Sequence, residues 1–280
     1  MIKESIYCLV SFFIICSCSR NSGSNNNDPG HRMLLIGNSF FKPYANHLDD
    51  VAADAGYTEH NSTLIFRGGE NGWAISFWND STSAAHQEIK AAFDAGGIEY
   101  FGMTSGSSPN NRTEGFSEWI AYGLQQNPDM KVFISIPPID FPANWNDTAQ
   151  YYGFNSIELF YDYMVNTIIH KTVVDPLRAQ FPNTSIFTIP TGWAALNLYS
   201  LKEDGQLLDS INYFGPQATS LFTDAKGHQG QIIVEAGTLM WMKGIYQIDL
   251  ETNSYHTGFN TDLHGLADQI MNDHDPNYKQ

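Results

Sequence analysis

Short apolar runs alternate along the chain with longer segments whose apolar residues recur every three or four positions. Compact apolar runs predict buried strands, and the longer period predicts helices that cover a sheet. The predicted strands are Met33–Ile36, Thr63–Phe66, Ile98–Met103, Lys131–Ile136 and Ser185–Ile189. The predicted helices are Tyr44–Ala55, Ala84–Ala95, Phe116–Gln126, Ile157–Ala179, Gln231–Tyr246 and Asp262–Met271. This alternation predicts an α/β fold, a three-layer α/β/α sandwich with a mostly parallel five-stranded sheet.

The ends of the predicted helices carry their own signals. Gly56 follows the first helix, Gly96 follows the second, and Pro128 lies just after the third. Glycine adopts the backbone conformation that commonly ends a helix, and proline cannot continue one. Pro176 lies near the end of the longest helical pattern, so the sequence predicts a kink or an end at that position.

Residues 1–18 form an apolar leader. Lys3 precedes the mainly apolar run Ile6–Ile15, which is too short to span a membrane as a stable helix and is typical of a secretory signal. The leader ends in Ile15-Cys16-Ser17-Cys18, which resembles a bacterial lipobox. This resemblance implies that Cys18 becomes the lipidated first residue of an exported protein, anchored to a bacterial membrane in the periplasm or at the cell surface. The alternative is an ordinary cleaved signal peptide.

Residues 19–31 are small and polar, so they cannot bury apolar area and are predicted to form a flexible linker. One domain is expected over residues 32–280. All three cysteines, Cys8, Cys16 and Cys18, lie in the leader. The domain can therefore form no internal disulfide, and its stability must come from its core.

Composition and charge narrow the classes of partner. Hydrophobic residues make up 42% of the chain and charged residues 16%, as in globular proteins. The formal net charge of −16 disfavours nucleic acid, because phosphate binding requires clustered Lys and Arg, and neutral substrates or sugars fit better. The nine histidines show neither the His-x-His nor the His-Glu-x-x-His spacing of metal sites. We therefore predict no catalytic metal and no cofactor.

Three residues from the two ends of the domain can supply the chemistry of a serine nucleophile. The first predicted strand runs directly into Gly37-Asn38-Ser39, and Asp224 and His228 lie close together near the other end of the chain. A serine hydroxyl needs an imidazole to take its proton and a carboxylate to hold that imidazole in the right tautomer. A helix-capping serine, with an acid and a histidine on the surface, is the alternative interpretation of these residues.

These blocks resemble the SGNH (GDSL-like) hydrolase family, whose first motif is a strand followed by Gly-Asp-Ser or Gly-Asn-Ser. The resemblance implies a flavodoxin-like sheet, with Ser39 as the nucleophile. It also implies that His228 is the base and that Asp224 orients the imidazole. The last motif of the family is usually Asp-x-x-His, whereas three residues separate Asp224 from His228 in this chain.

The resemblance also implies an oxyanion hole. Its first two donors would be the backbone N–H groups of Ser39 and of Gly72, which lies in the loop after the second strand. Glycine suits this position because an amide without a side chain can approach a substrate closely. The family normally has an asparagine after the third strand, and this chain departs from that pattern. Thr104 would donate instead, or Asn110 or Asn111 from the following loop, or that donor is absent.

The expected function is a serine esterase that removes an acyl group, such as acetyl, from a carbohydrate through an acyl-enzyme. Four tryptophans near the predicted strand ends could pack against a sugar ring or belong to the core: Trp73, Trp78, Trp145 and Trp193. One alternative is a glycan-binding surface lipoprotein with impaired catalysis, suggested by the missing asparagine and the longer Asp–His spacing. The other is a lipase or a thioesterase on the same fold.

Overall fold

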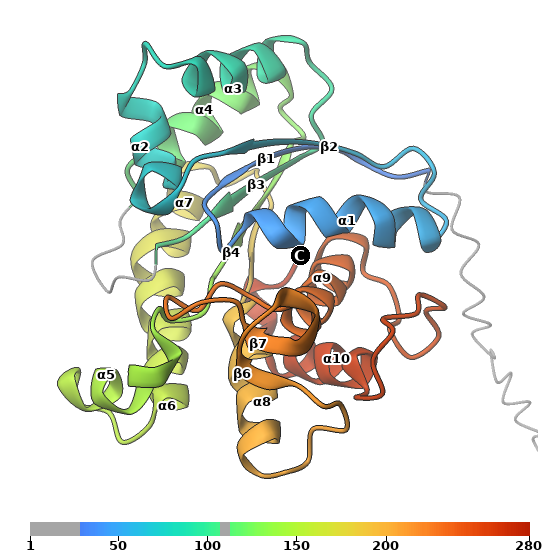
Figure 1. Ribbon diagram of the computed structural model, residues 1–280. Helices are drawn as coiled ribbons and strands as arrows, with labels where there is room; N and C mark the ends of the chain where they lie inside the picture. Colours follow the sequence, from blue (N-terminus) through green and yellow to red (C-terminus); the bar gives the residue numbers. More distant parts are fainter. Residues whose placement is uncertain (1–28, 107–112) are drawn as a thin grey trace, which may run out of the picture.

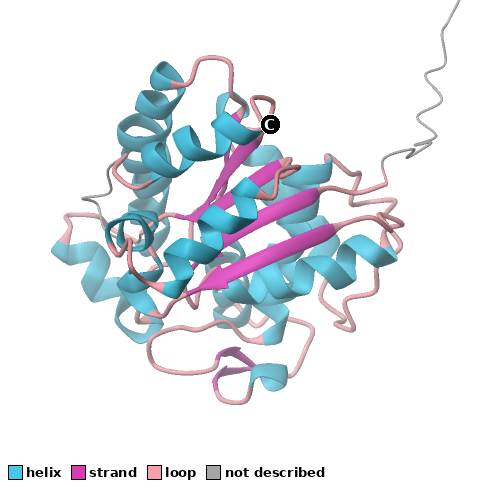
Figure 2. Cartoon of the chain, turned by 90° about the horizontal axis from the view of Figure 1, so that it is seen from above, coloured by secondary structure: helices cyan, strands magenta, loops and turns pink. Residues whose placement is uncertain are grey.

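Five parallel strands form the central sheet of the computed structural model, which describes residues 29–106 and 113–280. The strands are β1 (Arg32–Gly37), β2 (Asn61–Phe66), β3 (Tyr100–Thr104), β4 (Lys131–Ser135) and β5 (Ile186–Ile189). Their order across the sheet is β2-β1-β3-β4-β5, the order of flavodoxin-like doubly wound folds (Figures 1 and 2). All five predicted strands are confirmed, with bounds that differ by no more than two residues.

Helices cover both faces of this sheet. Figure 1 shows α3 and α4 on one side of the strands, with α1, α9 and α10 on the other, so the predicted three-layer sandwich is confirmed. The hydrophobic core fills the two spaces between the layers. The helices are α1 (Lys42–Asp54), α2 (Ala74–Asn79), α3 (Ala84–Asp94), α4 (Phe116–Gln126), α5 (Trp145–Tyr151), α6 (Ile157–Tyr163), α7 (Asp175–Gln180), α8 (Gly192–Glu203), α9 (Gln231–Tyr246) and α10 (Leu263–Asp273).

The longest predicted helix is present but changes its geometry along its length. After α6 the chain is π-helical over Met164–Val174, and α7 then continues to Gln180. The helix therefore does not end at Pro176. This proline lies in the first turn of α7, directly after the π-helical segment, so the change from π to α geometry falls next to it.

Several short elements and one longer helix were not predicted from the sequence. The short elements are α2, α5 and a two-stranded parallel sheet of β6 (Asn212–Phe214) and β7 (Ser220–Phe222), which Figure 2 shows apart from the main sheet. They span too few residues for a period to emerge. Helix α8 has twelve residues, but its buried positions include adjacent pairs, so its sequence lacks a clear apolar stripe.

Side chains from the π-helical segment, α7 and the C-terminal segment together cover the edge of the sheet at β5. The Arg178 Nε–H donates to the carbonyl of Ile186 at 2.8 Å, and the Thr188 hydroxyl contacts ring nitrogens of His170 and His274 at 3.0 and 2.9 Å. The ring of Tyr278 stacks on His170 at 3.6 Å. An uncovered edge strand can pair with another chain, and these contacts block that pairing. No helix in the described ranges combines the length and the apolar character that a membrane span requires.

We expect the free energy of unfolding to fall between pH 7 and pH 5 because of two buried histidines. Burial lowers the pKa of His170 to about 3 and the pKa of His274 to about 4. The unfolded chain, whose histidines titrate near 6.5, therefore takes up protons first as the pH falls. Their contribution is complete above pH 7 and declines below about pH 6.5, by about 1.4 kcal/mol per pH unit for each histidine.

Urea unfolding at pH 7, 6 and 5 measures this slope. The His170→Asn variant should show a shallower slope, while His256→Asn, a change at an exposed loop position, should keep the parental one. Equal slopes in the parent and the His170→Asn variant would contradict the prediction.

Candidate functional site

Ser39 lies where the strand order reverses. The chain leaves β1 toward β2 on one side and later returns to β3 on the other, so the carboxyl end of β1 is the switch point at which doubly wound sheets bind ligands. Ser39 follows β1 in a turn that leads into α1, and it is partly exposed. Its backbone N–H makes no hydrogen bond to any described residue, so that donor can serve a ligand.

The structure brings the three predicted residues together. The Nε2 atom of His228 lies 2.7 Å from the Ser39 hydroxyl oxygen, and its Nδ1 atom lies 2.6 Å from Oδ2 of Asp224. Each distance is that of a short hydrogen bond. Ser39, His228 and Asp224 therefore form a hydrogen-bonded row with the connectivity of a nucleophile, a base and an orienting acid. The serine and the histidine of this row are 189 positions apart in the sequence.

The turn between Asp224 and His228 accommodates the extra residue of this chain. Oδ1 of Asp224 accepts hydrogen bonds from the backbone N–H groups of Gly227 and His228 at 3.1 and 3.3 Å. Gly227 has φ of 98° and lies so close to Pro142 that a Cβ would come within 2.8 Å of the proline ring. Glycine thus satisfies both the backbone conformation and the space at this position.

Two neighbouring segments hold this turn in place. Thr223 N–H donates to the carbonyl of His228 at 2.7 Å, which closes the turn next to β7. Phe141 N–H donates to the carbonyl of Lys226 at 2.9 Å, which attaches the loop after β4 to the same turn. The histidine is therefore positioned by backbone contacts from both sides.

The surroundings of His228 favour an ionised Asp224. Burial acts to raise the pKa of Asp224, but hydrogen bonds from the His228 ring and from backbone N–H groups outweigh it, so its pKa lies below the usual value. Phe40, which the sequence analysis did not select, stacks on the imidazole at 4.9 Å. Its position directly after Ser39 in the sequence is the signal that could have identified it.

A second carboxylate, Asp140, lies near the imidazole but is held differently. Its nearest cation is Lys226, at 3.8 Å. Burial raises the pKa of Asp140, and the charges of Lys226 and His228 reduce that rise. The sequence analysis did not select Asp140, because the approach of the loop after β4 to His228 depends on tertiary packing.

Gly72 lies against the backbone just before the nucleophile. It ends a short 3₁₀ turn, Gly69–Gly72, and is buried. A Cβ at this position would come within 2.4 Å of the Arg67 carbonyl oxygen, 2.6 Å of the Gly37 carbonyl oxygen and 2.8 Å of the Asn38 Cα. All three are backbone atoms, so only glycine fits without moving the strand end.

Replacing Gly72 with alanine is expected to lower kcat by about 100- to 1000-fold, the typical effect of losing one oxyanion donor. The added methyl group would push the loop away from the end of β1, as the three close backbone contacts require. Steady-state kinetics with p-nitrophenyl acetate measures the loss. Gly68→Ala in the same loop is the matched control, since a Cβ there meets no atom within 4 Å. Equal activity of the two variants would contradict this assignment.

The structure does not assign a third oxyanion donor. Thr104 is buried, and its hydroxyl donates to the carbonyl of Ser105 at 3.1 Å. Asn110 and Asn111 lie outside the described residues, as does Cys18 with the rest of the leader. The hydroxyl oxygen of Ser105, directly after β3, is buried and has no hydrogen-bond partner among the described residues, and the sequence did not distinguish it from its neighbours. Within residues 29–106 and 113–280, no group of three or more His, Asp or Glu side chains is arranged to hold a metal ion.

No family model matches the chain, and no curated protein matches it either. Among solved structures, it is similar to the periplasmic domain of a lipopolysaccharide acetyltransferase from Salmonella ser. Paratyphi A. The two share 13% sequence identity over 58% of this chain and 67% of that chain, with a TM-score of 0.35.

Proposed function

We propose that the protein is a serine esterase of the SGNH type that removes an acyl group, in the first place acetyl, from a carbohydrate. The observation that carries the proposal is the hydrogen-bonded row of Ser39, His228 and Asp224. It is supported by the position of the row at the switch point of the sheet, where such folds bind ligands.

The mechanism follows from the donors and acceptors in the row. With Nδ1–H donating to Asp224, the Nε2 atom of neutral His228 can accept the Ser39 proton as Oγ attacks the ester carbonyl carbon. The backbone N–H groups of Ser39 and Gly72 would stabilise the resulting oxyanion. The imidazolium then returns its proton to the leaving alcohol, and the acyl group remains on Ser39.

Water completes the cycle. His228 takes a proton from a water molecule, whose oxygen attacks the acyl-enzyme carbonyl, and the second tetrahedral intermediate expels Ser39 Oγ as it regains the proton. The products are a carboxylic acid and the free hydroxyl of the carbohydrate. The continuous hydrogen-bonded row favours this activity over an impaired binding protein, because the longer Asp–His spacing does not disrupt the contacts that the chemistry needs.

The proposal includes an exported protein with a lipid on Cys18, as the lipobox-like leader implies. Mass spectrometry of the mature N-terminus tests this part. An N-terminal cysteine bearing a diacylglyceryl group supports it, and a mature N-terminus at any other residue refutes it.

A fluorophosphonate probe and an acyl-chain series test the activity. The purified protein should release acetate from acetylated xylan and hydrolyse p-nitrophenyl acetate. The probe should form one Oγ–P bond on Ser39, release fluoride and abolish turnover. Faster hydrolysis of long-chain p-nitrophenyl esters would favour a lipase, and faster hydrolysis of acyl thioesters would favour a thioesterase. Glycan binding without probe-sensitive turnover would overturn the esterase proposal.

A further inference from the structure

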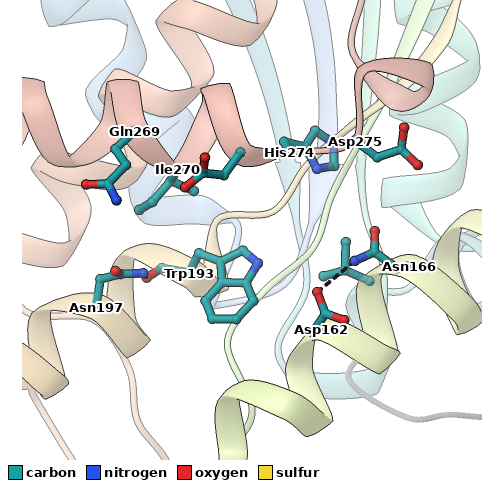
Figure 3. Close-up of a pocket in the computed structure, with 10 residues that line it drawn as sticks. Asp162, Asn166, Trp193, Asn197, Gln269, Ile270, His274 and Asp275 are labelled. Atoms are coloured by element: carbon teal, nitrogen blue, oxygen red, sulfur yellow. Dashed lines mark hydrogen bonds between the residues drawn. The ribbon is translucent and has the colours of Figure 1, made fainter.

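A second cavity lies at the β5 edge of the sheet, away from the row of Ser39, His228 and Asp224. Its volume is about 240 Å³. It lies between the long helix that begins with α6, the helix α8, and the end of α10 (Figure 3). Ser39 follows β1, and two strands separate β1 from β5, so these two strands are about 14 Å apart across the sheet. No residue of the catalytic row lines this cavity.

The indole of Trp193 lines the cavity and lies between the other lining residues, as Figure 3 shows, and it is partly exposed. The ring of Tyr161 packs edge-on against it at 5.2 Å, with an interplanar angle of 88°. Tyr161 is itself fixed, because its hydroxyl donates to the Ile136 carbonyl at 2.8 Å and accepts from the Gly192 N–H at 2.9 Å. The indole is therefore a rigid apolar platform, which a ligand can use without a large loss of side-chain entropy.

Hydrogen-bonding groups surround this platform on both sides. Figure 3 shows Asn197 and Gln269 on one side of the indole, with Asp162 and Asn166 on the other. Asn166 donates to Asp162 at 2.8 Å, and the Asn197 amide donates to the Trp193 carbonyl at 2.8 Å. These contacts fix the amides and leave their carbonyl oxygens, with the second carboxylate oxygen of Asp162, as acceptors for hydroxyl groups.

We propose that this cavity binds a single unit of a neutral saccharide. A sugar ring offers an apolar C–H face to an indole and hydroxyl donors to amide and carboxylate oxygens. The cavity is smaller than the 300–1,000 Å³ of sites for drug-sized ligands, which suits one sugar unit. No Lys or Arg lines it, whereas Asp273 and Asp275 do, so an anionic glycan is disfavoured.

This binding site would act independently of ester cleavage, since none of its groups touches Ser39 or His228. It would hold one part of a glycan while another part occupies the site around Ser39. The proposal does not depend on the esterase activity, and binding alone is sufficient to test it.

Isothermal titration of the full chain with neutral hexasaccharides of glucose, xylose and N-acetylglucosamine provides the test. At least one should bind with Kd of about 1 mM or tighter, and Ser39→Ala should bind it equally well. Gln269→Trp, which fills the cavity from an exposed position, should weaken binding at least tenfold. Asn272→Trp, at an exposed position on the same helix outside the cavity, is the matched control and should bind like the parent. Trp193→Ala should also weaken binding at least tenfold.

Three results would overturn the proposal. The first is no binding of any neutral hexasaccharide up to about 10 mM. The second is undiminished binding by Gln269→Trp, which would place the sugar elsewhere. The third is binding only of a chitosan or oligogalacturonate hexamer, which would assign the cavity to a charged group. Near-ultraviolet circular dichroism of each variant keeps misfolding from being mistaken for lost affinity.

Discussion

Replacing Ser39 with alanine is expected to lower kcat for p-nitrophenyl acetate by about 10⁵-fold or more, as loss of the nucleophile does in other serine hydrolases. Without Oγ no acyl-enzyme can form, and only the oxyanion donors remain to accelerate attack by water. Among the residues that the structure describes, the Ser39 side chain hydrogen-bonds only with His228, so the variant should fold normally. Steady-state hydrolysis and thermal unfolding of the same preparation measure both expectations.

Ser200→Ala serves as the matched control for this change. Ser200 lies on α8 and is partly exposed, and removing its hydroxyl leaves Ser39, His228 and Asp224 unchanged. It should retain full activity. If Ser39→Ala kept more than about one hundredth of the parental rate, a nucleophilic role for Ser39 would be refuted, because the residual rate of a triad lacking its nucleophile is far lower.

Asp224→Asn is expected to lower kcat by about 10³- to 10⁴-fold while leaving the fold intact. The carboxylate accepts the Nδ1–H proton of His228 at 2.6 Å, whereas an asparagine amide can donate to Nδ1 and so place the proton on Nε2. In that tautomer the imidazole cannot accept the serine proton. Because hydrogen bonding lowers the pKa of Asp224, the carboxylate of the parent stays ionised throughout pH 5 to 9. Kinetics over this range should therefore show the loss at every pH.

The Asp140→Asn variant tests whether the carboxylate of Asp224 acts by orienting the His228 ring or only by placing negative charge near it. Asp140 is also close to His228, but its nearest partner is Lys226 at 3.8 Å, and it makes no hydrogen bond with the imidazole. Its loss should change kcat by less than about tenfold, in the range of charge effects without direct contact. If Asp140→Asn and Asp224→Asn lowered kcat by similar factors, Asp224 would not be the residue that orients the imidazole.

The elements predicted most accurately are those with strong local signals. Helices α4 and α9 have the predicted bounds, since Pro128 follows one closely and Gly230 precedes the other. Helix α8 was missed because it is buried along much of its surface, and a helix with apolar residues on several sides has no clear period. The predicted end at Pro176 was wrong, because helix α7 continues to Gln180, although the helix changes from π to α geometry next to this proline.

The five strands, the layers and the three candidate residues of the row could be inferred from the chain because apolar periods and turn motifs reflect interactions over a few neighbouring residues. The strand order was implied only by the resemblance to the SGNH family. Contacts between distant segments have no such local signature. Packing alone decided that Gly72 lies against Gly37, that Gly227 fits beside Pro142, and that the Trp193 indole is exposed in a cavity. These features arise from the close fit of whole layers, in which each position depends on many side chains far away in the sequence.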